Sequence, residues 1–199
     1  GWLSIRQERD ETARRVALDA AMAHPDDPHL EALLGELDYR EDRLRRAAAR
    51  YRRAVELAPG EAPYARRLEK IERELAAEAG YDRADSGHFT IRFDGEQDDE
   101  LARMLLHPHE DAWDELGAEL DALPRQPITV VLYTREAFHD TTRAHRKVAG
   151  LYDGKIRLPA GGLDRVTEPL ERVIRHELVH ALLHAKGQGR VPRWLHEGL

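Results

Sequence analysis

The sequence of 199 residues contains no cysteine. Disulfide bonds, cysteine-ligated metal sites and thiol nucleophiles are therefore excluded. Aromatic residues make up only 6% of the chain, and no apolar run approaches the length of a membrane span. Charged residues make up 35%, which is typical of a soluble protein. The net charge of −7 and the lack of a basic stripe argue against nucleic acid as the main partner, but nothing indicates the compartment.

The most informative pattern in the sequence is His-Glu-x-x-His at residues 176–180. On a helix, His176 and His180 lie one turn apart on the same face, so that both imidazoles can bind one zinc ion. Glu177 leans toward the same side and can take a proton from a water on the metal without being a ligand. A catalytic zinc usually has three protein ligands, and Glu197 is the candidate for the third.

The residues around this pattern predict a helix from Thr167 to Lys186. Thr167 can cap its N-terminus, and acidic residues follow in the first turn. An apolar stripe runs along the segment at intervals of three to four residues, formed by Leu170, Val173, Ile174, Leu178, Ala181 and Leu182. Gly187 is then expected to end the helix.

Three segments together carry a resemblance to a known family: His176-Glu177-Leu178-Val179-His180, Pro192-x-Trp194-Leu195-x-Glu197-Gly198, and Gly150 to Pro159. Over about 87–199 the chain resembles the gluzincin metallopeptidases, in particular the bacterial peptidase-MA-like domains that are often joined to tetratricopeptide repeats. The resemblance implies an α+β domain with a small mixed sheet, and zinc-dependent hydrolysis of peptide bonds. It also implies His176, His180 and Glu197 as zinc ligands and Glu177 as general base. Gluzincins take a further Tyr or His from later in the domain, so we expect the domain to continue beyond Leu199.

Residues 1–80 carry a repeat with an offset of 34 residues. The equivalent pairs are Ala13 and Ala47, Ala17 and Tyr51, Ala20 and Ala54, and Pro25 and Pro59. This pattern resembles tetratricopeptide repeats, in which small residues such as Gly35 and Ala47 let two helices approach closely. We expect a half-repeat at 2–24, a full repeat at 28–61 and a capping helix at 62–79. The array serves either as a spacer or dimer surface, or as a groove for a partner peptide.

The second half of the chain predicts strands and helices in alternation. Turn-forming residues at 81–87 indicate a linker, after which Phe89, Ile91 and Phe93 alternate as the inner face of a strand. A helical stretch at 96–123 contains Pro108, which implies a kink or two helices. A buried strand at 127–133 and a short helix at 134–142 follow, and then a hairpin at 151–158 whose Asp-Gly pair favours a type I′ turn.

The strand formed by Ile156, Arg157 and Leu158 is the candidate substrate-binding edge. In the gluzincin class, a strand before the zinc helix lies at the rim of the cleft, where an extended peptide can pair with it. The alternative is that this strand only covers the core.

Together these features predict an α+β protein with a helical array at 1–80, a linker at 81–87 and the N-terminal part of a metallopeptidase domain at 88–199. The predicted cofactor is Zn²⁺ and the predicted partner is a peptide or protein substrate, with a second protein partner for the helical array as a further expectation. Two other functions stay open. One is a non-catalytic binding module that keeps the peptidase fold, and the other is a zinc amidase that acts on cell-wall or small-molecule substrates.

Overall fold

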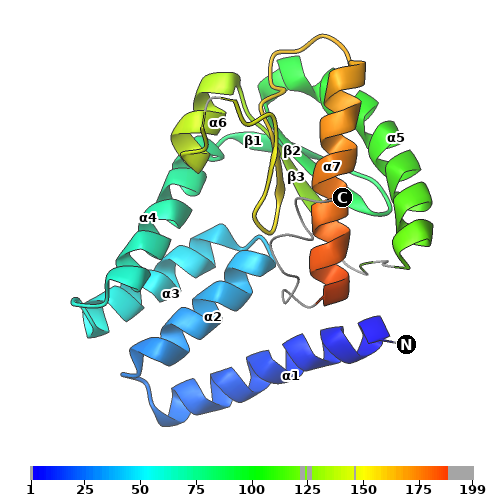
Figure 1. Ribbon diagram of the computed structural model, residues 1–199. Helices are drawn as coiled ribbons and strands as arrows, with labels where there is room; N and C mark the ends of the chain where they lie inside the picture. Colours follow the sequence, from blue (N-terminus) through cyan, green and yellow to red (C-terminus); the bar gives the residue numbers. More distant parts are fainter. Residues whose placement is uncertain (1, 122–123, 125–126, 146, 188–199) are drawn as a thin grey trace. The chain divides into compact units, whose positions relative to one another are not determined.

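The computed structural model divides into two compact units, Gly1–Ala79 and Gly80–Leu199 (Figure 1). It describes residues 2–121, 124, 127–145 and 147–187. In these residues the fold is mixed α+β, which confirms the predicted class, and it contains seven helices and one five-stranded sheet. None of the helices in this described part combines the length and the apolar character of a membrane span.

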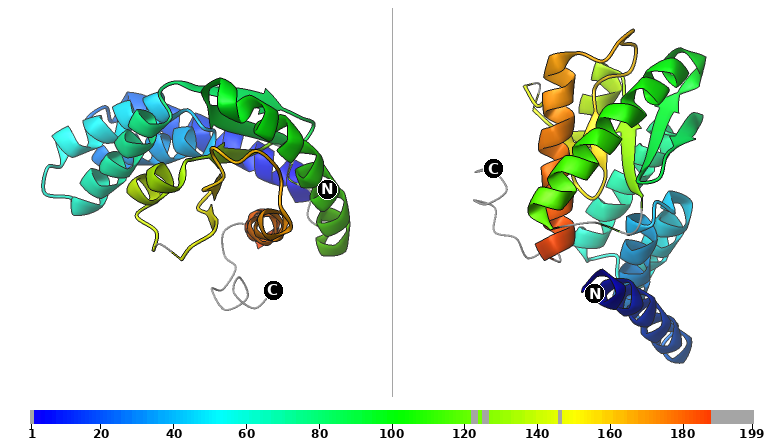
Figure 2. Two further views of the ribbon diagram at one scale, coloured as in Figure 1. Left: turned by 90° about the horizontal axis from the view of Figure 1, so that it is seen from above. Right: turned by 90° about the vertical axis from the view of Figure 1, so that its right-hand side faces the viewer.

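Four successive helices build the first unit. They are α1 (Trp2–Ala23), α2 (Pro28–Arg40), α3 (Leu44–Leu57) and α4 (Ala62–Ala77). Each helix packs against the next one along the chain, and Figure 2 shows the same succession from two further sides. Their bounds follow the half-repeat, the repeat and the capping helix of the sequence analysis.

The closest approach in this unit is between α2 and α3. A Cβ atom added to Gly35 would lie 2.8 Å from Cδ2 and 2.9 Å from Cε2 of the Tyr51 ring. Ala47 and Ala54 are fully buried in the same helix as Tyr51. The predicted role of Gly35 and Ala47, to let two helices pack tightly, is confirmed.

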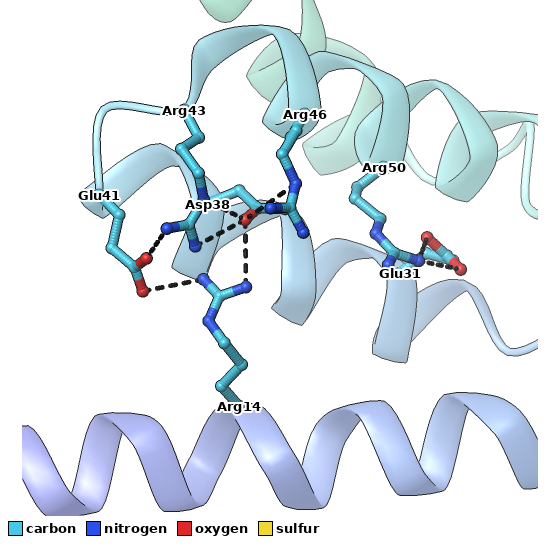
Figure 3. A network of polar contacts seen from close by, with 7 residues as sticks. All are labelled: Arg14, Glu31, Asp38, Glu41, Arg43, Arg46 and Arg50. Atoms are coloured by element: carbon cyan, nitrogen blue, oxygen red, sulfur yellow. Dashed lines mark hydrogen bonds and ion pairs between the residues drawn. The ribbon is translucent and has the colours of Figure 1, made fainter.

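A buried carboxylate joins three helices of the first unit (Figure 3). Asp38 of α2 is 1% exposed, and its Oδ1 accepts hydrogen bonds from Arg14 Nη1 at 3.1 Å and from Arg43 Nε at 2.9 Å. Arg14 also donates to Glu41 Oε1 at 2.9 Å. Because the buried Asp38 carboxylate is paired with arginines from α1 and from the start of α3, these contacts hold α1 and α3 against α2.

A mixed sheet forms the centre of the second unit. Its strands are β1 (Tyr81–Asp85), β2 (Phe89–Asp94), β3 (Ile128–Leu132), β4 (Leu151–Tyr152) and β5 (Ile156–Leu158). The strand order is β1-β2-β3-β5-β4. The pairs β2–β3 and β3–β5 are parallel, whereas both outer pairs are antiparallel.

Helices α5 (Gly95–Leu120) and α7 (Glu168–Gly187) pack on one face of this sheet, and α6 (Arg135–Thr142) follows β3. The shared core combines alternate residues of the strands with the apolar stripes of α5 and α7. It includes Phe89, Ile91, Phe93, Val130, Leu132, Ile156, Leu158, Leu101, Leu105, Trp113, Ile174 and Leu178. The predicted inner face of the strand at 88–93 is confirmed, and so is the burial of the next strand. Burial of these side chains is the main force that holds α7 in place.

The structure differs from the sequence analysis at the predicted linker. Within 81–87, residues Tyr81–Asp85 form β1, which pairs along the outer edge of β2. Most of its side chains are exposed, so β1 has no apolar alternation and the period of two gives no signal for it. The strand exists because β2 offers it hydrogen-bonding partners.

Pro108 does not divide the predicted helix, because α5 is continuous from Gly95 to Leu120. The alternative of two helices is wrong. Leu101 and Leu105 before the proline and Trp113 after it all enter the core. Packing on both sides therefore offsets the cost of a proline within the helix, which is about 3 kcal/mol.

The predicted hairpin forms, but its turn is not type I′. Tyr152 pairs with Ile156, which leaves three residues in the loop. Gly154 has a φ of +107°, whereas Asp153 is not among the residues of positive φ. A type I′ turn needs two central residues with positive φ. Because the loop has a third residue, Lys155, Asp153 does not need a positive φ.

The prediction that β5 is the free edge is also wrong. Ile156 and Arg157 pair with β3 on one side and with β4 on the other. All three residues of β5 are buried. The outer strand on this side of the sheet is β4, since only β5 pairs with it among the described residues. β5 takes the inner position because the apolar side chains of Ile156 and Leu158 are buried in the core.

Candidate metal centre

Two histidines of α7 bring their ring nitrogens together. His176 Nε2 and His180 Nε2 are 3.0 Å apart, and the ring planes meet at 83°. Two imidazoles on one tetrahedral zinc, each with a bond of about 2.05 Å, have their nitrogens about 3.3 Å apart. The observed pair needs to open by only a few tenths of an ångström. The prediction that both side chains share one helix face is confirmed.

The opposite face of α7 explains why this pair is held in place. Ile174, Leu178 and Leu182 are fully buried against the sheet and α5. At the start of the helix, Glu171 N donates to Thr167 O at 2.9 Å, and Glu168 and Glu171 are the acidic residues of the first turn. Acidic residues there interact favourably with the helix dipole.

An ion pair also fixes α7 beside the histidines. Arg175 donates to both carboxylate oxygens of Glu115 on α5, at 2.9 and 2.7 Å. The hydrogen bonds from Arg175 lower the pKa of Glu115, so the pair stays charged into the acidic range. This contact is exposed and bidentate, and it limits rotation of α7 about its axis.

Glu177 is only 5% exposed, although it neighbours His176. The backbone of Gly150, just before β4, covers its side chain. A Cβ atom at residue 150 would lie 3.0 Å from both Cγ and Oε1 of Glu177, and 2.5 Å from Cγ1 of Val173. Only glycine therefore lets the chain pass this close, and the passage fixes the Glu177 carboxylate by packing.

Two residues beside the pair, Tyr152 and His184, are not among the predicted site residues, although His184 continues the histidine series by one more turn. The ring of Tyr152 on β4 contacts the ring of His184, with centroids 5.7 Å apart. His184 is thus in contact with the outer strand, one turn beyond His180. The sequence signal for Tyr152 was its place directly before the Asp-Gly pair, which predicts that it ends the first strand of a hairpin.

The predicted third ligand, Glu197, lies outside the described residues, and so does the rest of the segment 192–198. Within the described residues, no group of three or more metal-binding side chains comes together. The two histidines nevertheless fit the predicted ion. Imidazole suits zinc, whereas magnesium and calcium require oxygen ligands. Glu197 stays a prediction.

The residues predicted to contact substrate, Ile156, Arg157 and Leu158, have no exposed surface. Arg157 Nε donates to Asp153 Oδ1 at 3.0 Å, and its Nη1 donates to Tyr133 Oη at 2.6 Å. These contacts satisfy the buried guanidinium inside the sheet. The three residues are structural, and direct binding of a peptide to them is excluded by their burial.

Comparisons with protein-family models, with curated proteins and with solved structures found no match to this chain. The residues of α7 and the elements that pack around them are therefore the basis for inferring a function.

Proposed function

We propose that this chain belongs to a zinc-dependent metallopeptidase of the gluzincin type. The observation that carries the proposal is the 3.0 Å approach of His176 Nε2 to His180 Nε2 on a helix anchored in the core. In this proposal both histidines hold the zinc, with Glu197 as third ligand. Bound zinc supplies Lewis-acid chemistry for hydrolysis of a carbonyl group.

Glu177 acts as the general base in the proposed reaction. Its carboxylate accepts the proton of the attacking water and later returns a proton to the leaving amine. The packing of Gly150 against Glu177 supports this role, because a general base must be held in one orientation. Its low exposure also keeps bulk water away from the carboxylate.

A peptide substrate would lie along β4 instead of β5. The outer edge of β4 is beside α7, the helix that carries both histidines. An extended peptide can add there as a further strand through main-chain hydrogen bonds. This arrangement retains the predicted mode of binding and moves it to Leu151–Tyr152.

The first unit supports a second part of the proposal, a tetratricopeptide-like array. Four helices with the expected bounds support it, as does the tight contact of Gly35 with Tyr51. The same helices favour the alternative function, a binding module without turnover, in which the array recruits a protein partner.

Zinc stoichiometry tests the assignment directly. The chain is loaded with zinc, desalted and measured by atomic emission, alongside H176A, H180A and E197A variants. One zinc per chain, lost in each variant, is the expected result. H184A is the matched control, because His184 is on the same helix, is not one of the proposed ligands and has its ring against Tyr152. Unchanged stoichiometry in both H176A and E197A contradicts the assignment.

The E177Q variant separates an enzyme from a binding module. It keeps the size of the side chain and removes its basicity, so that zinc binding is retained while peptide hydrolysis is lost. Partner binding that E177Q leaves intact, in a protein without measurable hydrolysis, favours the module.

A further inference from the structure

A cavity of about 190 Å³ lies between α6, α7 and the loop that precedes β4. Its apolar surface comes from Val148, Leu170 and Val173. Cavities that hold a whole small ligand measure about 300–1,000 Å³. This one is smaller and suits a single side chain or one end of a chain.

Three basic side chains line the same cavity: Arg135 and His139 from α6, and Lys147 from the loop. Arg135 and His139 are four residues apart, so they share one face of α6. None of the described residues that line the cavity is acidic. Among the residues that the structure describes, neither Arg135 nor Lys147 has an acidic partner, although Arg157 and Arg175 each have one.

The N-terminus of α7 borders the same cavity. Pro169 and Leu170 lie in the first turn of a 20-residue helix and also line the cavity. The acidic residues of that turn, Glu168 and Glu171, offset the partial positive charge of the helix dipole. The positive charge at the cavity therefore comes from its basic side chains.

The cavity adjoins the candidate metal centre through Val173. Val173 precedes His176 by three residues and Glu177 by four, so it lies one helical turn, about 5.4 Å, along α7. Gly150 packs against both Val173 and Glu177. The cavity therefore lies next to the segment that covers Glu177.

We propose that this cavity is a subsite for a carboxylate on a short apolar stem of the substrate. Arg135 and Lys147 bind the carboxylate through charge-assisted contacts, and Val148, Leu170 and Val173 contact the stem. The carboxylate belongs either to an acidic side chain or to the C-terminus of a peptide. The inference rests on the proposed peptidase function and names its substrate class, which is peptides with a negative charge next to the scissile bond.

Peptide binding tests the proposal and distinguishes the two sources. ¹⁵N-labelled chain is titrated with acetyl-Ala-Ala-X-Ala-Ala-amide, where X is Glu, Gln or Leu, and with acetyl-Ala-Ala-Leu that ends in a free carboxylate. Backbone shifts of Val148, Leu170 and Val173 report occupancy. Stronger binding of the Glu peptide than of the Gln peptide, by about tenfold, identifies an acidic side chain. Stronger binding of the free acid than of the amidated Leu peptide identifies a chain terminus.

Charge variants show whether the cavity is responsible. R135Q and K147Q are each expected to weaken binding of the preferred carboxylate peptide about fivefold, and the double variant more than tenfold. R172Q is the matched control. Arg172 is exposed on α7, pairs with Glu168 and does not line the cavity. Equal binding of charged and neutral peptides, no binding at all, or no effect of the double variant overturns the proposal.

The titration is repeated with EDTA present and with the H176A variant. Because Arg135 and Lys147 do not depend on the metal, carboxylate binding at the cavity is expected to persist in both. A parent chain that binds no zinc but keeps the carboxylate preference refutes the metallopeptidase proposal alone. Zinc binding without any carboxylate preference refutes the subsite alone.

Discussion

The acid sensitivity of the second unit is expected to depend on one buried histidine, His109 of α5. Its ring has no exposed surface, its Nδ1 donates to Leu105 O at 2.7 Å, and it packs on the edge of Phe89. Among the described residues, its Nε2 has no hydrogen-bond partner. Burial lowers the pKa of His109 from 6.5 to about 4. The native state therefore holds this side chain neutral.

The sign and size of the effect follow from that difference. Above pH 6.5 the ring is neutral in both the folded and the unfolded chain, and His109 does not change the free energy of unfolding with pH. As the pH falls below 6.5, His109 is protonated in the unfolded chain but stays neutral in the folded chain, so the free energy of unfolding decreases. The loss is about 2–3 kcal/mol at pH 4.5 and about 3 kcal/mol well below pH 4.

Urea unfolding at pH 7.0 and 4.5 measures this loss. The reporter is Trp113, which contacts Phe89 and is the only tryptophan left in a W2F/W194F background. The difference in stability between the two pH values is expected to be smaller by about 2–3 kcal/mol in H109L than in the parent. H107L is the control, because the His107 side chain is 84% exposed two residues away. An equal pH dependence in H109L and the parent refutes the reasoning.

Two glycine substitutions test the close contacts of the two units. G35A forces a methyl group against the Tyr51 ring and is expected to lower the free energy of unfolding of the first unit by about 1–3 kcal/mol, measured in urea. G60A is the control, because no atom lies within 4 Å of its added Cβ. It should change the free energy of unfolding by less than about 0.5 kcal/mol. G150A is expected to destabilise the second unit by a similar amount and to displace Glu177, with loss of any peptide hydrolysis but retention of zinc. Hydrolysis in G150A at the parent rate contradicts a positioning role for Gly150.

Much of the fold could be predicted from local patterns. The alternation of Phe89, Ile91 and Phe93 and the apolar stripe of α7 identified the elements that enter the core, because burial selects side chains at the period of each element. The helices of the first unit followed from the repeat spacing. By contrast, β1 could not be predicted, because its exposed residues have no period and only the edge of β2 makes it a strand.

The candidate site was predictable where it depends on one helix. Four residues on α7 place His176 and His180 together whatever the rest of the chain does. The substrate edge was not predictable in this way, since a hairpin sequence does not say which of its two strands pairs with the next one in the sheet. In the structure, β5 pairs with β3 because Ile156 and Leu158 are part of the core, and β4 is the outer strand.

The sequence by itself thus determined the α+β class, the helical array and the histidine pair, because each depends on residues close together in the chain. Only the tertiary structure decided that Glu177 is covered by Gly150, 27 residues earlier, and that Arg135, Lys147 and Val173 surround one cavity. Such contacts join segments that are far apart in the chain. Side-chain periodicity describes single helices and strands and carries no information about which distant segments meet.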